Sequence, residues 1–503
     1  MIKLFIVGMP GAGKSYLGKA MAEFLNCVHM DTDDIVEKRM GQSIPNIFEK
    51  YGEPHFRKLE EEALWKCVSM KEDMICSTGG GIVEKDENRV VLQKFPAVYI
   101  KKTMDELLEN LRSNQDNRPL LKGNSADNLE KLFQRRQTHF ETFPSIKIPQ
   151  GRLKFKDITR LLYEITEKTT LDHQMQEKTI EGMHPVVIKP LIAKKQLQDS
   201  EYVITSETVQ AIYTSFFKEG NNLILPDGEL SKSHDNLKKV WQFLINKAVS
   251  REEVITGFGG GTITDITGFA SSTYKRGTVF NFVPTTLLAQ VDAALGGKNA
   301  INVSGIKNVC GSFAFPKCVY IDPLIVFSTE KSEIENGLIE GLKVALLVHE
   351  DADTLDSQLK LAQTILEKPN LHAMNRFIQR AVQDKMKIVN SDPFEKSRRK
   401  FLNLGHSYGH VYESTFNISH GKAVALGMLK MLREKKDPMI RAYCDFFERI
   451  VEKQLDALNI LWNDDMLKRL LNDKKNTKDH IVFIDLEKPG KPFKVVVKKS
   501  DMH

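Results

Sequence analysis

Two glycine-rich segments limit what this chain can fold into, because each has the form of a phosphate-binding loop. Residues 8–15 read GMPGAGKS, which fits the pattern GxxxxGK[ST] and follows an apolar run at residues 2–7. Residues 255–269 read ITGFGGGTITDITGF, with three consecutive glycines after another apolar run. Glycine lets backbone amides approach a phosphate closely, and a following helix offers its N-terminus to the same anion. Two different nucleotide sites therefore predict two catalytic domains.

Length and composition agree with this prediction. The chain has 503 residues, more than one hydrophobic core usually holds, and 41% of them are hydrophobic and 27% charged. No apolar run approaches the roughly 20 residues that span a bilayer, and the first residues predict a strand that leads into a phosphate loop rather than a signal peptide. We therefore expect two or three globular domains and no membrane partner.

Charge and cysteine content narrow the class of partner and the compartment. The formal net charge is +6 and no basic stripe is interleaved with aromatic residues, so nucleic-acid binding is not expected and small anionic substrates are. The six cysteines are scattered without CxxC spacing, as is typical of free thiols in a reducing compartment. These features favour a cytoplasmic protein.

The hydrophobic pattern predicts α/β architecture in both halves. Strands are expected at residues 2–7, near 28, at 74–77 and at 97–100, with helices from residue 14 and over residues 33–50. Such alternation favours a parallel sheet covered by helices. A second alternating region begins with strands at 185–188 and 202–205, and helical patterns dominate from about 323 to about 470. The expected domains are a P-loop domain at 1–170, a linker at 171–184, a nucleotide-binding α/β domain at 185–322 and a helical domain at 323–503.

The N-terminal motif specifies its own chemistry. Gly11 and Gly13 permit the tight loop whose amides surround phosphates, Lys14 reaches the terminal phosphates, and the hydroxyl of Ser15 is a ligand for magnesium. ATP and Mg²⁺ are therefore the expected cofactors of this half. The motif does not name the acceptor of the phosphoryl group.

The residues that follow the phosphate loop indicate the acceptor of the phosphoryl group. The segments MDTDDIVEKRMGQSIPNIFEKYGEPHFRKLEEE, STGGGIV and NRPLL resemble shikimate kinase over nearly all of the first 165 positions. The resemblance implies that Asp31 helps to hold magnesium and that Asp33 binds the shikimate hydroxyls near the transferred phosphoryl group. It also implies that Arg57 grips the substrate carboxylate and that Gly79, Gly80 and Gly81 form the glycine turn on the substrate side. Arg118 is then the lid arginine that reaches the phosphates, and Arg136 is a second carboxylate-binding arginine. Thr138 and Phe140 stand where the family usually has proline and tyrosine.

Histidine spacing in the second half predicts a metal site. His406 and His410 lie four residues apart, on one face if helical, while His420 and Glu340 come from elsewhere in the chain. Three nitrogen or oxygen ligands with open positions describe a catalytic zinc site. The spacing alone does not decide which of the three histidines bind the metal.

The second half resembles 3-dehydroquinate synthase. The segments LPDGELSKS, GFGGGTITDITGF, YKRGTVFNFVPTTLLAQVDAALGGKNAIN, KNVCGSFAFPKCVYID, ENGLIEGLKVALL, FLNLGHSYGHVYES and ISHGKAVALGM extend from the glycine turn through the helical part. The resemblance implies NAD- and metal-dependent cyclisation of a seven-carbon sugar acid phosphate to 3-dehydroquinate with release of phosphate. It implies Glu340, His406 and His420 as ligands of zinc, with cobalt as the alternative metal, and a homodimer formed through this half.

The same resemblance assigns the remaining site residues to the substrate or to NAD. Groups expected at the substrate are Asp292, Lys298, Lys343, Lys385, Arg399, Asn403 and His410, with Arg276, Lys307 and Asn308 as further binding residues. Groups expected at NAD are Asp227, Glu229, Lys232, Gly259, Gly260, Gly261, Asp265, Thr285 and Thr286. Lys474 or Lys475 is expected to supply another contact to phosphate or carboxylate.

Three departures from the pattern stand out. Thr264 replaces a usual glycine, Ala294 a usual serine, and Lys422 a usual acid two residues after His420. None replaces an expected ligand, so activity is expected, with Lys422 able to alter metal affinity or pH dependence.

Other assignments are weighed against this one. The alternative for the first half is another small-molecule kinase such as gluconate kinase. Arg57 and the DTD acid pair are evidence against that alternative. The second compares with a metal-dependent polyol or alcohol dehydrogenase, which would release NADH. A noncatalytic regulatory module would keep the fold but has no need of Lys14, Asp33 or the metal ligands.

Overall fold

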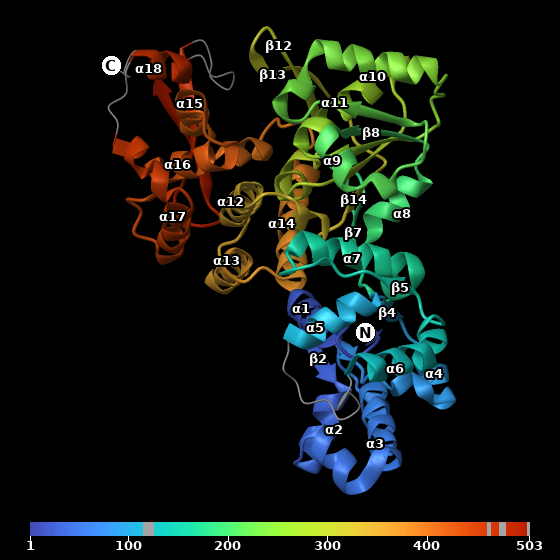
Figure 1. Cartoon of the computed structure of the whole chain (residues 1–503). Helices are drawn as coiled ribbons and strands as arrows, with labels where there is room; N and C mark the ends of the chain where they lie inside the picture. The colour runs from blue at the N-terminus through green and yellow to red at the C-terminus, as the bar shows by residue number, and fades with distance from the viewer. Residues whose placement is uncertain (114–124, 460–463, 472–478, 500–503) are drawn as a thin grey trace. The chain divides into compact units, whose positions relative to one another are not determined.

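The computed structural model describes residues 1–113, 125–459, 464–471 and 479–499 (Figure 1). By its internal contacts the chain divides into two compact units. Unit 1 contains Met1–Gln176 with Asn370–His372, and unit 2 contains Glu177–Pro369 and Ala373–His503. Arg118, Lys474 and Lys475 lie outside the described residues.

Unit 1 is built on a parallel sheet. Its strand order is β2-β3-β1-β4-β5, with bounds Val28–Asp31, Met74–Ser77, Lys3–Val7, Ala97–Ile100 and Ser145–Ile146. All five residues of β1 are buried, as the apolar run at residues 2–7 predicts for a central strand. Because the strands are parallel, the segments that follow Val7, Asp31 and Ser77 leave the sheet at the same edge. This edge receives the phosphate loop, the acid pair and the second glycine turn.

Helices flank this sheet along the chain. They are α1 Lys14–Leu25, α2 Thr32–Met40, α3 Ile44–Ser69, α4 Asp86–Leu92, α5 Met104–Ser113, α6 Ser125–Phe140 and α7 Phe155–Lys168. The single helix predicted over residues 33–50 is wrong. Gly41 ends α2 in the left-handed region with φ 62°, a conformation that glycine adopts without steric cost, and α3 starts three residues later.

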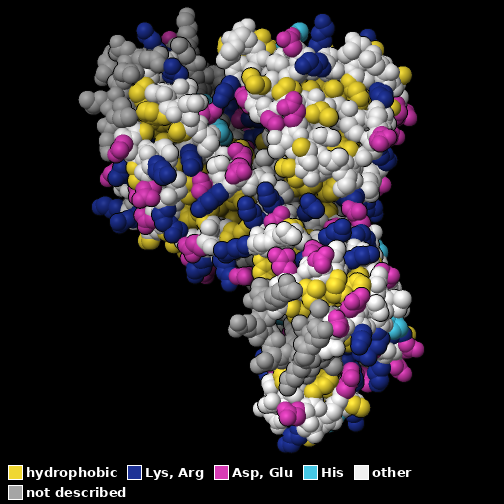
Figure 2. All heavy atoms as spheres, viewed as in Figure 1, with side chains coloured by type: hydrophobic (Ala, Val, Ile, Leu, Met, Phe, Trp, Pro, Cys, Tyr) yellow, Lys and Arg dark blue, Asp and Glu magenta, His cyan; other side chains and the backbone are white. Residues whose placement is uncertain are grey.

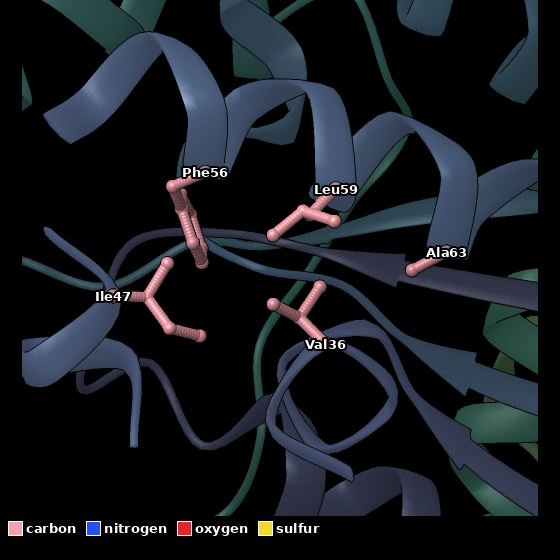
Figure 3. Close-up of a cluster of buried hydrophobic side chains, with 5 residues drawn as sticks. All are labelled: Val36, Ile47, Phe56, Leu59 and Ala63. Atoms are coloured by element: carbon pink, nitrogen blue, oxygen red, sulfur yellow. The ribbon is translucent and has the colours of Figure 1, made fainter. Parts of the chain in front are cut away.

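A small apolar cluster fixes α2 against α3. Val36 of α2 and Ile47 of the first part of α3, before the kink at Gly52, face a row further along α3 spaced three and four residues apart. Figure 3 shows the side chains pointing toward one another: Val36, Ile47, Phe56, Leu59 and Ala63. Burial of each large apolar side chain contributes roughly 1.5 to 3 kcal/mol. The packing therefore holds the part of α3 that also carries Arg57 and Glu60.

Unit 2 begins with a larger sheet of order β6-β7-β14-β11-β10-β8-β9. The strands are Lys178–Ile180, Val186–Ile188, Cys318–Ile321, Phe280–Pro284, Ile255–Gly259, Tyr202–Ser206 and Asn222–Leu225. The β6–β7 pair is antiparallel and the other pairs are parallel. Part of the segment 171–184 is therefore regular structure, because the 3-10 turn Leu171–Gln174 and strand β6 fall within it.

Four helices and a hairpin accompany this sheet. The helices are α8 Ile192–Asp199, α9 Glu207–Ile212, α10 His234–Asn246 and α11 Gly261–Thr273, and the antiparallel hairpin is β12 Lys298–Val303 with β13 Ile306–Phe313. A π-helical turn, Ala289–Ala293, carries Asp292. Such turns are rare and often occur at functional sites.

The rest of unit 2 is mainly helical, as predicted. It comprises α12 Lys331–Val348, α13 Ala352–Glu367, α14 Leu371–Ser391, α15 His406–Phe416, α16 His420–Leu432, α17 Pro438–Ile450 and α18 Asp464–Leu471. Helix α16 packs against α15, α12 and α17. The antiparallel hairpin β15 His480–Leu486 and β16 Pro492–Lys498 was not predicted from the sequence.

The surface carries both signs of charge. Figure 2 shows Lys and Arg side chains interspersed with Asp and Glu on the visible face. In the four described stretches, no helix combines the length and the apolar character needed to cross a membrane.

Candidate active sites

The first glycine-rich segment forms a loop between β1 and α1. Gly11 and Gly13 have φ values of 83° and 90°, and a Cβ atom at Gly11 would lie 2.9 Å from Leu111 Cγ. Lys14 starts α1 and donates hydrogen bonds to the carbonyl oxygens of Gly8 at 3.0 Å and Met9 at 3.1 Å. The loop therefore combines a helix N-terminus, glycine backbone and an ammonium group, the features that bind phosphates.

A hydroxyl and two carboxylates lie beside this loop. Ser15 Oγ donates to Asp31 Oδ2 at 2.6 Å, and Asp31 Oδ1 accepts from the backbone N–H of Asp33 at 3.0 Å, which caps α2. Hydroxyl and carboxylate oxygens are the hard ligands that Mg²⁺ prefers. A Cβ atom at Gly79 would lie 2.6 Å from Asp33 Oδ1, so the second glycine turn passes directly against this acid.

Arg57 lies on α3, and its guanidinium group lies against the same glycine turn. Its Nη1 is 2.7 Å from Glu60 Oε2 and its Nη2 is 2.8 Å from Glu53 Oε1. A Cβ atom at Gly81 would overlap the Arg57 guanidinium in its present position, and one at Gly80 would lie 2.8 Å from Pro10 Cδ. The structure thus brings together Arg57 and the three glycines that the sequence predicted as a substrate site.

Glu60 is a site residue that the sequence analysis missed. It is buried, and its Oε1 has no hydrogen-bond partner among the described residues. Burial raises the pKa of this carboxyl, while the Arg57 guanidinium opposes the rise. Its position three residues after Arg57 on α3 is the signal that would have identified it.

Arg136 is also held by an acid. Its Nε donates to Glu84 Oε1, its side chain is 1% exposed, and Nη2 lacks a hydrogen-bond partner within the described chain. Burial lowers the pKa of Arg136 and Glu84 counteracts this, while the charge of Arg57 lowers it further. A buried guanidinium nitrogen without an acceptor is suited to binding a carboxylate oxygen.

In unit 2 the glycines at residues 259–261 join β10 to α11. Gly259 ends β10, Gly260 caps α11 and Gly261 is its first residue. A Cβ atom at Gly259 would lie 2.7 Å from Ile263, and one at Gly260 would lie 3.2 Å from Thr286. Thr285 donates its backbone N–H to Gly259 O at 2.9 Å, so both predicted threonines lie beside the glycine turn.

Lys232 connects the residues predicted for the dinucleotide. Its Nζ is 2.5 Å from Asp265 Oδ2, 3.0 Å from Asn308 Oδ1 and 3.9 Å from Glu229 Oε1. Burial raises the pKa of Asp265 to about 6, against the opposing effect of Lys232. Asp227 instead accepts hydrogen bonds from Thr208, including one of 2.6 Å from its hydroxyl. No contact described here joins it to Lys232.

Three predicted metal ligands converge from three helices. Glu340 lies within α12, His406 starts α15 and His420 starts α16, and one ligand atom of each lies within 4.8 Å of the others. Glu340 Oε1 is 3.9 Å from Nε2 of both histidines and lacks a hydrogen-bond partner among the described residues. A buried carboxylate oxygen without a donor between two imidazole nitrogens fits a divalent metal, and this donor set suits zinc.

The outer nitrogens of both histidines have acceptors. His406 Nδ1 lies 3.1 Å from Leu404 O, and His420 Nδ1 lies 3.0 Å from Glu413 Oε2. Such contacts place the proton on Nδ1 and leave Nε2 as the ligand atom. The ring of His410 is 5.7 Å from that of His406 and 6.3 Å from that of His420, so it lies beside the three-residue group.

The predicted substrate cations are paired with acids. Lys385 contacts Asp292, Lys343 contacts Glu340, and Lys298 Nζ lies 2.6 Å from Glu395 Oε2. Burial raises the pKa of Asp292, but Lys385 and Lys343 outweigh it and lower the pKa to about 2. This cluster adjoins the metal ligands through Glu340.

The other predicted contacts differ in their surroundings. Arg399 is 1% exposed, and a Cβ atom at Gly296 would lie 2.5 Å from its Nη2. Asn403 Nδ2 donates to Lys400 O at 3.0 Å, and Lys307 pairs with Glu413 at 2.6 Å. Arg276 is exposed on a 3-10 turn, and none of the described contacts joins it to the cluster.

Two of the departures from the family pattern fit their positions. The Thr264 hydroxyl donates to Gly261 O at 3.0 Å inside α11, and this residue is buried. Ala294 is also buried. Neither alters the glycine turn.

The fold and the two residue groups define an enzyme with a P-loop kinase half followed by a nucleotide-binding α/β half that carries a helical metal-binding part. Family models match each half: shikimate kinase over residues 10–166, 3-dehydroquinate synthase N-terminal over 222–336 and 3-dehydroquinate synthase C-terminal over 337–476. The chain belongs to the family of bifunctional shikimate kinase/3-dehydroquinate synthases, and the fold class and family expected from the sequence are confirmed.

Individual relatives support this assignment. A bifunctional shikimate kinase/3-dehydroquinate synthase of Thermotoga maritima is 38% identical over 429 residues, which cover 85% of this chain and 84% of that protein. A 3-dehydroquinate synthase of Pyrococcus furiosus is 38% identical over 45% of this chain and 68% of its own length. Among solved structures, 2-deoxy-scyllo-inosose synthase complexed with carbaglucose-6-phosphate, NAD⁺ and Co²⁺ has a TM-score of 0.54 at 21% identity, covering 65% of this chain and 97% of that one. This structural likeness shows the fold of unit 2.

Proposed function

We propose that this enzyme catalyses two steps of the shikimate pathway. Unit 1 phosphorylates shikimate with ATP to give shikimate 3-phosphate. Unit 2 converts 3-deoxy-D-arabino-heptulosonate 7-phosphate to 3-dehydroquinate and releases phosphate. The observation that supports this most strongly is the bifunctional relative, whose match covers 85% of the chain. The family models include the residues of both sites, since they match residues 10–166, which contain Lys14 and Ser15, and residues 337–476, which contain the Glu340, His406 and His420 group.

In the kinase half, charge placement accounts for the reaction. Lys14 and the loop amides bind the ATP phosphates, and Ser15 and Asp31 hold Mg²⁺. Asp33, beside the glycine turn, orients the shikimate hydroxyl and accepts its proton. Arg57 binds the substrate carboxylate because its guanidinium faces the turn on which the substrate lies.

A second arginine completes the carboxylate site. Arg136 Nη2, which has no hydrogen-bond partner among the residues that the structure describes, supplies the second donor, and binding shifts Arg136 away from sole pairing with Glu84. Arg118, outside the described residues, is assigned to the phosphates by the sequence pattern.

In the synthase half, Glu340, His406 and His420 hold the metal. When bound, zinc or cobalt would supply a Lewis acid for the substrate hydroxyls, and NAD would supply reversible hydride transfer. The glycine turn, Thr285, Thr286, Asp227, Glu229, Lys232 and Asp265 bind the dinucleotide. These assignments place the dinucleotide residues and the metal ligands in one unit.

The remaining polar residues bind the doubly charged substrate. Its phosphate and carboxylate are neutralised by six cations: Lys298, Lys307, Lys343, Lys385, Arg399 and Arg276. Asn308 and Asn403 act as neutral donors. His410 faces the phosphate, and Asp292 orients a hydroxyl. Since Lys298, Lys343 and Lys385 are paired with acids here, substrate binding exchanges those protein acids for substrate anions.

The test measures both reactions on one preparation. With the heptulosonate phosphate, a small amount of NAD⁺ and Zn²⁺, phosphate should appear without net NADH, and His406→Ala should stop its release. With shikimate and ATP, the same His406→Ala protein should remain active, which controls for folding of unit 1. NADH accumulation equal to substrate consumed would favour the polyol dehydrogenase assignment instead.

A homodimer formed through unit 2 is part of the proposal. Exposed Arg276, without a described contact to its own cluster, is suited to reach the site of a second copy. Light scattering at increasing protein concentration checks the assembly. A monomer at assay concentrations that keeps full synthase activity would contradict it.

The proposed location is the cytoplasm. All six cysteines, Cys27, Cys67, Cys76, Cys310, Cys318 and Cys444, are free thiols, as suits a reducing compartment. Fractionation of the source cells followed by assay of both activities tests this.

A further inference from the structure

Glu413 is an acid near the candidate metal site and is not one of the expected site residues. It lies on α15, seven residues after His406 and three after His410, so all three occupy one face of this helix. Its side chain is 18% exposed and is positioned between a candidate metal ligand and the β12–β13 hairpin.

We propose that Glu413 is a positioning residue that presents His420 to the metal and is itself held in place by Lys307. Glu413 Oε2 lies 3.0 Å from His420 Nδ1, and Glu413 Oε1 lies 2.6 Å from Lys307 Nζ. Each carboxylate oxygen therefore has a different partner. This inference rests on the proposed metal site.

The contact with His420 fixes which ring nitrogen can bind a metal. A carboxylate only accepts hydrogen bonds, so Nδ1 must carry the proton and Nε2 keeps its lone pair. That Nε2 lies 3.9 Å from Glu340 Oε1, within the three-ligand group. Glu413 therefore selects the tautomer and the ring orientation that the metal requires.

His420 depends on this contact more than His406 does. The outer nitrogen of His406 is bound by the backbone carbonyl of Leu404, which the fold holds in place. The His420 side chain is 35% exposed compared with 13% for His406, so protein packing restricts it less. Loss of the Glu413 carboxylate should thus release one ligand of three.

Lys307 extends the arrangement to the dinucleotide side. Lys307 and Asn308 are consecutive on β13, and Asn308 has φ 52°, which departs from extended backbone. Asn308 Oδ1 accepts from Lys232 Nζ, which pairs with Asp265. One short segment of the hairpin therefore contacts both the acid behind the metal ligand and the lysine at the predicted NAD site.

The experiment measures metal affinity without substrate. Full-length protein is stripped of metal and titrated with Zn²⁺ in competition with a chromophoric chelator. Glu413→Ala should weaken Zn²⁺ binding by roughly 10- to 100-fold, the usual effect of removing a carboxylate behind a ligating histidine. Glu413→Gln should weaken it less, because its carboxamide oxygen can still accept the Nδ1 proton but carries no charge. Co²⁺ titration should show a changed visible spectrum for Glu413→Ala, since ligand geometry changes.

Two control variants separate the possible causes. Lys307→Met removes the other partner of Glu413 but leaves the His420 contact, so it should weaken Zn²⁺ binding less than Glu413→Ala does. His406→Ala removes a ligand and should weaken Zn²⁺ binding strongly. If His406→Ala binds Zn²⁺ as the parent does, the metal site itself is wrong.

The positioning role has its own decisive outcome. If His406→Ala weakens binding but Glu413→Ala and Glu413→Gln both bind Zn²⁺ within twofold of the parent, Glu413 does not position His420. Circular dichroism checks that each variant is folded. Should Glu413→Ala fail to fold, the isosteric Glu413→Gln decides alone, with unchanged Zn²⁺ affinity and Co²⁺ spectrum overturning the proposal.

Discussion

Lys422 Nζ lies 3.1 Å from Glu335 Oε2, and both side chains are largely buried. Lys422 is two residues after His420 on α16, and Glu335 is five residues before Glu340 on α12. The ion pair therefore joins two of the three helices that carry the candidate metal ligands. It also shows how a lysine is accommodated where the resembled synthases usually have an acid, because a nearby acid neutralises it.

The first prediction concerns this pair. Lys422→Glu places two carboxylates side by side and should lower the free energy of unfolding of unit 2, while Lys422→Glu combined with Glu335→Lys should recover most of the loss. The expected coupling is about 1 kcal/mol, because the pair is partly screened by solvent. Urea unfolding of the parent, both single variants and the double variant measures it. Simple additivity of the two single effects would show that the ion pair contributes nothing.

Arg57 leads to the second prediction. Arg57→Ala removes a guanidinium that lies against the glycine turn, so binding of the shikimate carboxylate should weaken by roughly 2 to 4 kcal/mol while ATP binding is retained. The Michaelis constants for shikimate and for ATP measure the two effects separately. An unchanged constant for shikimate would show that Arg57 does not bind the carboxylate.

A comparison with Lys14→Met sharpens this test. Lys14 lies in the phosphate loop rather than at the substrate turn, so its loss should abolish phosphoryl transfer itself. Synthase activity of both variants should equal that of the parent and serves as an internal control for protein concentration.

A pH dependence follows from Asp392. Burial alone would raise the pKa of Asp392, but backbone N–H groups of Ser397, Arg399 and Lys396 donate to it and lower the pKa to about 2. A carboxyl whose folded-state pKa is depressed stabilises the fold above its unfolded-state pKa and loses this effect as the pH falls toward the folded-state value. The stabilisation is therefore complete near neutrality and declines between about pH 4 and pH 2.

Asp392→Asn tests that dependence. The substitution should destabilise unit 2 by about 1 to 3 kcal/mol at pH 7, because hydrogen bonds to a charged acceptor are replaced by neutral ones. The difference in urea midpoint from the parent should shrink as the pH is lowered through 4. A difference that stays constant over this range would mean that the charge of Asp392 is not responsible.

Much of both sites could be predicted from the sequence, because the residues that bind phosphate are set by local backbone. The glycines of the phosphate loop have positive φ, and a Cβ atom at most of the glycines at 79–81 and 259–261 would press on a neighbouring side chain. The candidate metal ligands were predicted differently: the spacing of His406 and His410 indicates a metal site, and the resemblance to 3-dehydroquinate synthase selects His406 and His420 as its histidines. Their convergence with Glu340 is confirmed by the geometry.

The acids that pair with the site cations were not predicted. Glu60 lies three residues after Arg57 on α3 and could have been identified from that spacing. Glu84, Glu395 and Glu413 resemble any other acid in sequence, and the Lys307–Glu413 pair joins residues 106 apart. Such pairings depend on tertiary contacts, which sequence periodicity does not encode. The break at Gly41 was missed for a different reason, because a helical apolar pattern continues on both sides of it.

The last prediction concerns the independence of the two units. Because each unit has its own sheet and a complete set of the described site residues, a fragment of residues 1–176 should phosphorylate shikimate and a fragment of residues 177–503 should release phosphate from the heptulosonate phosphate. The assignment of residues 370–372 to unit 1 makes the N-terminal fragment the more sensitive one, since it lacks them. Its Michaelis constants should match those of the full chain within roughly threefold, while any loss of stability should appear as a lower thermal midpoint. An N-terminal fragment that folds by circular dichroism yet has no kinase activity would show that unit 2 completes the kinase site.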